Sequence, residues 1–466
     1  MTDIETDYLV IGAGASGLAF TDALIGSADV DVVMVDRRHR PGGHWNDAYP
    51  FVRLHQPSAT YGVTSRPLGT ERIDATGPNA GFYERATGPE ICDYFRRVLE
   101  DDFVGSGKVR FFGQSDYVGQ DADDHVFRSR LTGGSTTVRV RRKLVDATYL
   151  ETSVPATHTP GFTIGEGVDL IAVGELVNVT TPPAGFIVLG SGKTAMDACS
   201  FLLDGGVDPD KIQWVRPRDP WCMNRSSWQP LDQVASTIES LSLDLQSLAE
   251  AGSLSELFQL LEERQLLLRL DTAVEPTMFR GAILSPAEHE SLQQIERVVR
   301  HGRVRRIDTD RLTLDEGEVR TDRGTLHVDC TAYGLRATPP RPMFEADRIT
   351  PQSLMGGFTT YNAAVVGHVE AVRDDTADKN RLCPPTPYPS RSVDWITVFT
   401  GGFRATTQML EEPDIGAWLS TCRLNTTRGL TDHMADPRVQ VALGRWFENL
   451  EPALANADRL LMTADR

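Results

Sequence analysis

The chain has 466 residues, of which 40% are hydrophobic and 24% charged, and its net charge is −18. The excess of acidic residues argues against a nucleic-acid partner or an anionic membrane surface, because binding to phosphates requires local positive charge. No apolar stretch reaches the roughly 18 residues of a membrane span. The six cysteines lie far apart, without metal-ligand spacing. We therefore expect a cytoplasmic enzyme of two or three domains, with reduced thiols, no metal and no membrane contact.

The chain opens with the order strand, glycine turn, helix, strand. Residues 7–11 and 30–35 are apolar runs typical of buried parallel strands, and 18–25 have helical spacing. The turn between them reads Gly-x-Gly-x-x-Gly, which permits a tight turn, close approach of a pyrophosphate and close packing of helix on strand. An acid ends the second strand, where it can accept hydrogen bonds from ribose hydroxyls. The predicted dinucleotide-binding residues here are Gly12, Gly14, Ser16, Gly17, Asp36 and Arg37.

The stretch that follows predicts a helix and then strands outside the first sheet. Residues 88–103 have the spacing of an amphipathic helix. Residues 109–112 and 126–150 look like strands of a side meander.

A second strand–turn–helix–strand unit begins at residue 186, with helix 196–203 and a second strand at 212–215. Its turn reads Gly-x-Gly-x-x-Ala, and arginines replace the acid after the second strand. Arginine at that place suits a 2′-phosphate and favours NADPH over NADH, although two solvated surface arginines would read the same. The lysine in the turn either reaches a phosphate or lies in solvent. The predicted residues are Gly190, Gly192, Lys193, Thr194, Arg216 and Arg218.

The rest of the chain predicts a helical insertion and helical C-terminal segment. Residues 230–300 have helical spacing, including 257–261 and 266–270, and β-like segments return at 304–331. A glycine-containing segment, 356–362, precedes a helix at 363–371, and a proline-rich loop and further helices follow.

Two short sequences after Asp36 identify a resemblance. Gly42-Gly43-His44-Trp45 and Arg53-Leu54-His55-Gln56-Pro57 resemble the N-terminal region of the flavin-containing and Baeyer–Villiger monooxygenases. The segment 328–334 likewise resembles the family's Asp…Ala-Thr-Gly strand, so that the resemblance covers about residues 5–225 and 320–372. The family's linker motif, Phe-x-Gly-x-x-x-His, is absent. His158 is either its substitute or a plain loop histidine.

The resemblance implies an α/β fold with two Rossmann-like domains. FAD would bind a discontinuous domain, 1–160 and 320–466, and NADPH would bind 161–319, with the helical insertion at about 230–300. It places a set of residues near the flavin, although Trp45 and His55 are equally typical of core aromatics. A helix start facing the flavin would stabilise negative charge on the reduced ring through its dipole. The implied flavin contacts are Gly43, His44, Trp45, Gln56 and Thr360, and the implied catalytic residues are Arg53, His55, Gln56 and Asn362.

The same resemblance implies a monooxygenase that inserts one oxygen atom from O₂ into a small organic substrate through a C4a-peroxyflavin. Two other hypotheses stay open: a flavin-dependent reductase or dehydrogenase with a non-oxygen acceptor, and a non-catalytic redox-sensing protein. A disulfide reductase is disfavoured because it requires a closely spaced cysteine pair, which this sequence lacks.

Overall fold

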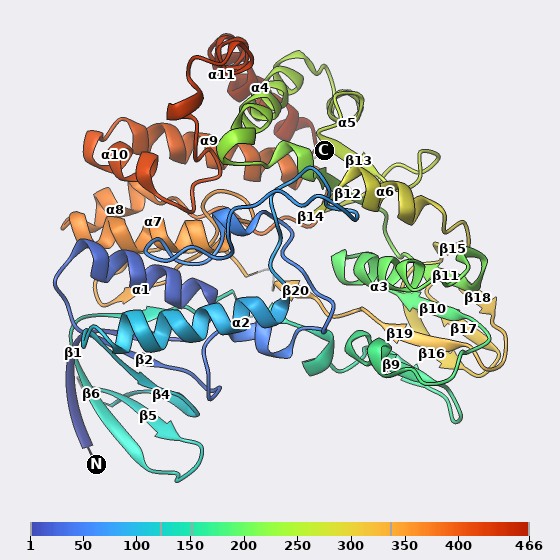
Figure 1. Cartoon of the computed structure of the whole chain (residues 1–466), viewed down its shortest axis with the longest axis horizontal. Coiled ribbons are helices and arrows are strands. Elements are labelled where there is room, and N and C mark those ends of the chain that lie inside the picture. Colours follow the sequence, from blue (N-terminus) through green and yellow to red (C-terminus); the bar gives the residue numbers. More distant parts are fainter. Residues whose placement is uncertain (1, 122–123, 151, 336–337, 465–466) are drawn as a thin grey trace.

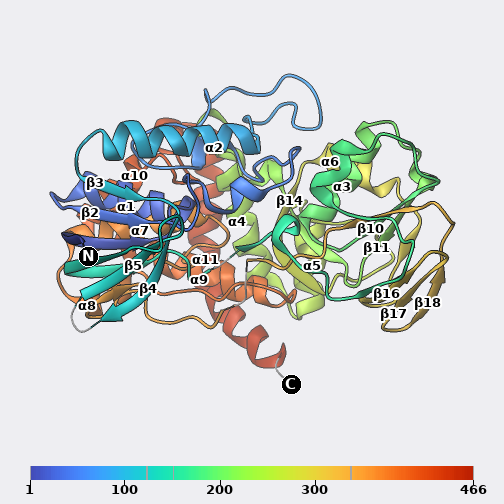
Figure 2. The same cartoon turned by 90° about the horizontal axis from the view of Figure 1, so that it is seen from below.

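The computed structural model describes residues 2–121, 124–150, 152–335 and 338–464 (Figure 1). Two β-sheets lie towards opposite ends of the long axis, as both views show (Figures 1 and 2). Helices from the insertion and the C-terminal region gather along one side, at the top of Figure 1.

The first sheet has the strand order β3-β2-β1-β6-β5-β4, with a short strand, β21, also paired to β6. Pairing is parallel among β1, β2, β3, β6 and β21, and antiparallel among β4, β5 and β6. The strands are β1 (Thr2–Ile11), β2 (Val32–Val35), β3 (Val109–Phe112), β4 (Ser115–Asp121), β5 (Asp124–Ser129), β6 (Ser135–Asp146) and β21 (Arg348–Ile349). The prediction that residues 109–112 belong to a side meander is wrong, because β3 extends the parallel sheet beside β2. A short apolar strand does not by itself specify its partner.

Helices α1 (Ala15–Ser27) and α7 (Thr359–Val372) pack against each other in the core of this first unit. Gly367 makes the close approach possible, since a Cβ there would lie 2.3 Å from the carbonyl oxygen of Phe20. The predicted helix at 88–103 is confirmed as α2 (Gly88–Arg97), which a π-helical turn continues to Val104.

The second sheet is wholly parallel, with the order β15-β11-β10-β19-β9. Its elements are β9 (Leu170–Ala172), β10 (Phe186–Leu189), helix α3 (Lys193–Asp204), β11 (Ile212–Val215), β15 (Val298–Val299) and β19 (Leu326–Asp329). The predicted strands at 186–189 and 212–215 are confirmed. Strand β19, which lies beyond the proposed domain end at residue 319, pairs with β10 in this sheet.

A smaller sheet packs beside the second one, with the order β18-β17-β16-β8. Its strands are β8 (Thr163–Ile164), β16 (Val304–Asp308), β17 (Arg311–Leu314) and β18 (Gly317–Arg320). A separate two-stranded ribbon pairs β7 (Thr152–Ser153) with β20 (Gly334–Leu335).

The insertion is only partly helical. Its elements are α4 (Val234–Glu250), α5 (Leu254–Glu263), β13 (Leu267–Arg269), β14 (Met278–Leu284) and α6 (Pro286–Gln293), and β13 and β14 flank β12 (Pro220–Asn224) in one sheet. The predicted helix at 266–270 is wrong. The positive φ of Gln265, 57°, ends the helical stretch, and Leu267 then pairs with Met223 of β12. Pairing in the tertiary structure here overrides the helix propensity of leucine.

The C-terminal helices complete the helical layer. They are α8 (Thr376–Leu382), α9 (Asp394–Leu410), α10 (Pro413–Thr421) and α11 (Pro437–Ala464). Helix α11 packs along α4, and aromatic and leucine side chains from α4, α5, α9 and α11 share one apolar cluster. Among the described residues, no helix combines the length and apolarity that a bilayer crossing would require.

Candidate functional site

The first glycine turn connects β1 to α1 with very little space. Gly12 has a φ of +99°, and a Cβ on Gly17 would lie 2.0 Å from the carbonyl oxygen of Gly12, so both positions require glycine. Gly14 approaches Gly43, and a Cβ on Gly43 would lie 3.0 Å from the Cα of Gly14. No side chain of the described residues caps the N-terminus of α1. The turn therefore leaves helix N–H groups and a narrow backbone groove open to a ligand.

Asp36 lies at the end of β2 beside this turn. Its Oδ2 accepts a hydrogen bond from the backbone N–H of Ala13 and its Oδ1 accepts one from that of Arg38, both at 2.7 Å. These bonds fix the carboxylate, and each oxygen keeps a lone pair for a ribose hydroxyl. Asp36 and Arg37 both line the cavity described below.

The second glycine turn has the same geometry at the end of β10. Gly190 has a φ of +132°, and a Cβ there would lie 2.8 Å from the carbonyl oxygen of Cys330. Gly192 is the N-cap residue of α3, and no side chain of the described residues caps that helix. Lys193 is not in solvent: its ammonium is largely buried and forms an ion pair with Asp197, so the solvated alternative is wrong.

The two predicted arginines after β11 take different positions. The guanidinium of Arg216 lies 4.8 Å from the ring centre of Trp214 and pairs with Asp219 at 3.3 Å, and Arg216 is only 3% exposed. It does not line the cavity, whereas Arg218 does. The prediction that Arg216 reads a 2′-phosphate therefore has no support in the geometry, because its guanidinium lies within the core of the second unit.

Arg218 belongs to a cluster of cations that the sequence did not reveal. Burial lowers the pKa of Arg218, and the charges of Arg280 and Arg303 lower it further. Arg218 donates a 3.4 Å hydrogen bond to the carbonyl of Ser390, and the guanidinium of Arg280 lies 5.5 Å from the ring centre of Tyr388, two residues earlier. The three arginines come from the segment after β11, from β14 and from the loop before β16, and all three line the cavity. Only the tertiary fold brings them together.

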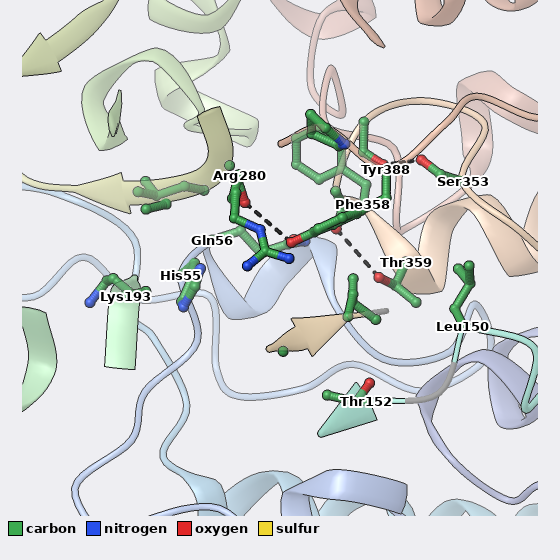
Figure 3. A pocket seen from close by; sticks show the side chains of 18 of the residues that line it. His55, Gln56, Leu150, Thr152, Lys193, Arg280, Ser353, Phe358, Thr359 and Tyr388 are labelled. Atoms are coloured by element: carbon green, nitrogen blue, oxygen red, sulfur yellow. Dashed lines mark hydrogen bonds between the residues drawn. The ribbon is translucent and has the colours of Figure 1, made fainter. Parts of the chain in front are cut away.

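The three residues predicted from the Arg-Leu-His-Gln segment also diverge. His55 and Gln56 line the cavity, near Arg280 and Lys193 (Figure 3). Burial lowers the pKa of His55 to about 3, with a contribution from Lys193, so its imidazole is neutral at ordinary pH. Arg53 instead is exposed, donates a 3.1 Å hydrogen bond to the carbonyl of Arg85 and does not line the cavity.

The predicted aromatic pair lies beside the first turn. His44 stacks on Trp45 with ring centres 5.1 Å apart, and the indole N–H of Trp45 donates a 2.8 Å hydrogen bond to the hydroxyl of Tyr61. Burial lowers the pKa of His44 to about 4, with a contribution from Arg38. Both rings line the cavity, and Trp45 also packs against the core, while the flavin contacts implied for both residues stay predictions.

Residues at the start of α7 take supporting positions. Asn362 accepts a hydrogen bond from the backbone N–H of Met355 and donates one to the carbonyl of Gly356, so it holds the loop that precedes the helix. That loop and Thr359 line the cavity, but Asn362 and Thr360 do not. His158 does line it, with its Nε2 3.3 Å from the hydroxyl of Thr331.

A single cavity of about 1420 Å³ connects these features. It runs past both glycine turns and continues between the insertion and the C-terminal helices. In Figure 3, Lys193 and His55 lie on one side of the space, Thr359, Leu150 and Thr152 on the other, and Arg280 and Phe358 between them.

Similarity to known proteins shows which family the chain belongs to. A protein-family model described as an NAD(P)-binding Rossmann-like domain matches residues 10–64. Uncharacterized protein Rv2000 of Mycobacterium tuberculosis and Uncharacterized protein Mb2023 of Mycobacterium bovis are each 43% identical to the chain over 447 residues, which is 96% of this chain and 82% of theirs. The chain belongs to their family.

Several solved structures share the fold of this chain. Polycyclic ketone monooxygenase from Thermothelomyces thermophila aligns with a TM-score of 0.53 and 14% identity, over 96% of this chain and 90% of its own. A steroid monooxygenase bound to NADP aligns with a TM-score of 0.50 and 15% identity, over 79% and 84%. The predicted fold, with two Rossmann-like units and the architecture of Baeyer–Villiger-type monooxygenases, is confirmed.

Proposed function

We propose that the protein is an FAD- and NADPH-dependent oxidoreductase, and specifically a monooxygenase that transfers one oxygen atom of O₂ to a small organic substrate. The observation that carries the proposal is the single cavity onto which both glycine turns open. Two dinucleotides in one cavity can bring their reactive rings together. The steroid monooxygenase of similar fold is bound to NADP, which supports the choice of coenzyme.

The first turn fits the pyrophosphate and ribose of FAD. Its uncapped helix start offers N–H groups and a partial positive charge to the phosphates. Asp36 is fixed where it can accept from the ribose, and Gly43, His44, Trp45 and Gln56 continue along the wall. Bound FAD would supply the redox chemistry, as acceptor of a hydride and donor of electrons to O₂.

The second turn fits NADPH. Its helix start is likewise uncapped, and Arg218, Arg280 and Arg303 form a positive cluster on the same wall. Planar guanidinium groups suit the 2′-phosphate that distinguishes NADPH from NADH. In a chain of net charge −18, three cations grouped at one cavity wall indicate an anionic ligand.

The other residues of the cavity bind, orient and exclude water. His55 is neutral and Gln56 is held by a 2.8 Å hydrogen bond from its Nε2 to the carbonyl of Thr60, so both present fixed dipoles without net charge. Phe358 and Tyr388 add apolar surface (Figure 3). Exclusion of water by such side chains protects reactive oxygen chemistry from side reactions.

Flavin binding at the first turn is tested by Gly14→Val. Gly14 has an ordinary φ of −79°, and a Cβ there would make only a 3.6 Å contact with Gly43, so the variant is expected to fold. The added side chain fills the pyrophosphate groove, and we expect colourless protein, measured by visible absorbance and circular dichroism. The control is Gly26→Val at an exposed site where a Cβ meets no atom within 4 Å. A folded Gly14→Val protein with full FAD content contradicts this placement.

The monooxygenase proposal is tested by comparing O₂ and a quinone as acceptors of electrons from the reduced flavin. The NADPH-reduced enzyme is mixed with aerated buffer or, without oxygen, with a quinone, and flavin reoxidation is followed. A monooxygenase is expected to reoxidise rapidly in air and to release less peroxide per NADPH once a substrate is present. Reduced flavin that persists for minutes in air but reacts at once with quinone identifies the reductase alternative instead.

A further inference from the structure

The far end of the cavity, away from the two glycine turns, is a chamber walled by helices. Helices α4, α9, α10 and α11 all contribute to it. Among the described wall residues that these four helices provide, Asp244 of α4 alone has an ionisable side chain. Its neighbours on the wall include Leu241, one turn earlier on the same helix.

Asp244 has no partner in the described part of the protein. No hydrogen bond or ion pair reaches its carboxyl group, although the residue is only 7% exposed. Burial alone raises the pKa of this carboxyl group well above its usual range, with no contribution from a neighbouring charge. Burying a carboxyl group without a partner costs stability, because the group loses its hydration. A ligand that pairs with Asp244 would offset that cost.

Aromatic rings form another part of the chamber wall. Trp395 and Phe399 of α9 stack with centres 4.6 Å apart, Phe403 follows at 4.5 Å, and Trp446 of α11 lies 4.7 Å from Phe403. All four line the cavity. Side by side, these rings offer a broad apolar surface to the body of an organic ligand.

We propose that this chamber binds an organic ammonium ion, with the charged nitrogen paired to Asp244 and the apolar body of the ligand against the rings of α9 and α11. The inference rests on the proposed function, in which the chamber is the substrate end of the cavity. On binding, the carboxyl proton of Asp244 passes to solvent and the carboxylate pairs with the ammonium. The anchored nitrogen keeps its proton and has no free lone pair, so the atom that is oxygenated lies elsewhere on the substrate.

The first test compares three ligands that share one apolar body. Phenylbutylammonium, phenylbutanol and phenylpentanoate carry positive, neutral and negative head groups, and their binding to the purified holoenzyme is measured by titration calorimetry. We expect the ammonium to bind about tenfold more tightly than the alcohol, and the carboxylate most weakly. A preference for the alcohol indicates that Asp244 acts as a neutral hydrogen-bond donor and overturns the proposal, as does a preference for the carboxylate.

The second test removes the charge with Asp244→Asn, which keeps the shape of the side chain. We expect the preference for ammonium over alcohol to fall from about tenfold to nearly none, while alcohol binding changes little. The unliganded variant is expected to melt at the same or a higher temperature, because an unpaired acid is gone. The matched control is Glu239→Gln on the same helix, whose exposed carboxylate pairs with Arg438 and does not line the cavity.

These titrations require neither NADPH turnover nor O₂. An unchanged ammonium preference in Asp244→Asn sinks the inference and leaves the proposed redox function standing. Conversely, if the protein reduces quinones and does not oxygenate substrates, the same titrations still show whether the chamber prefers cations.

Discussion

The coenzyme preference that we propose depends on a single arginine at the cavity wall. Arg216 and Arg218 are separated only by Pro217, where the chain bends, yet the first is buried beside Trp214 and the second faces the cavity. Their place directly after a strand of the second unit predicted that both arginines bind the 2′-phosphate. Which of them faces the cavity depends on how this bend packs, and a sequence pattern does not encode that packing.

Arg218→Ala is expected to weaken NADPH use roughly tenfold relative to NADH, because it removes a charge-assisted contact to the 2′-phosphate. The measurement is kcat/KM for both coenzymes. Arg216→Ala should instead lower the melting temperature, because Asp219 loses a buried partner, and should affect both coenzymes alike. Equal losses of NADPH and NADH use in Arg218→Ala would show that the arginine cluster does not read the 2′-phosphate.

His55 provides a prediction about pH. Burial lowers its pKa in the folded state to about 3, whereas in the unfolded chain it keeps its ordinary value of 6.5. At intermediate pH the unfolded state therefore binds a proton that the folded state does not, so this histidine lowers stability as pH falls from 6.5 towards 3.

Replacing His55 by Gln removes that proton uptake. Between about pH 4 and pH 6, the unfolding free energy of the variant should fall with acid less steeply than that of the wild type, by about 1.4 kcal/mol per pH unit. Urea unfolding at several pH values gives both slopes. Parallel slopes for the wild type and His55→Gln would mean that His55 is protonated in the folded protein.

At the scale of elements, the sequence predicted structure best where a local rule decides it. The strands at 186–189 and 212–215 and the first glycine turn follow from apolar runs and from positions that require glycine. The spacing of the leucines at 266–270 predicted a helix wrongly, because pairing with β12 sets the structure of this stretch as a strand. Asp244 also lies in the insertion and could not be recognised from sequence, since its significance depends on the helices that surround it.

Helix α6 ties the insertion to both units through one carboxylate. Glu288 caps the N-terminus of α6, and its two oxygens also accept from Arg85 at 2.9 Å and from Arg225 at 2.7 Å. Burial alone would raise the pKa of Glu288, but Lys193, Arg225 and Arg85 hold it well below its usual range. The carboxylate is therefore ionised and pairs with two buried guanidinium groups, one at each oxygen.

Glu288→Gln leaves those guanidinium groups without a counter-charge. We expect a loss of about 3–5 kcal/mol in unfolding free energy, the usual cost of breaking a buried ion pair from one side. Glu239→Gln, which breaks an exposed pair with Arg438, should cost no more than about 1 kcal/mol. Urea denaturation of both variants gives the comparison, and similar small losses would show that the buried triad is not a major source of stability.

At the scale of the whole molecule, the proposed reaction depends on how the two dinucleotide-binding units are held together. The segment after the first turn reaches across to α3 of the second unit. The hydroxyl of Tyr49 donates a 2.6 Å hydrogen bond to Asp197, and Phe51 stacks on Phe201 with ring centres 4.2 Å apart. Asp197 is also the partner of Lys193 in the second turn, so this contact joins the segment around Tyr49 to the second glycine turn.

Tyr49→Phe keeps the ring and removes only the hydrogen bond to a charged acceptor, a contact worth about 1.5–3 kcal/mol. Because neither glycine turn is altered, we expect the FAD content to stay unchanged. We expect the rate of anaerobic flavin reduction by NADPH, followed by stopped-flow absorbance, to fall roughly tenfold or more. A loosened contact between the two units would align the nicotinamide and flavin rings less often. Tyr149→Phe is the matched control, because its hydroxyl bonds the carbonyl of Pro339 at an exposed site. If both variants reduce flavin at the wild-type rate, the contact between Tyr49 and Asp197 does not set the alignment of the two units.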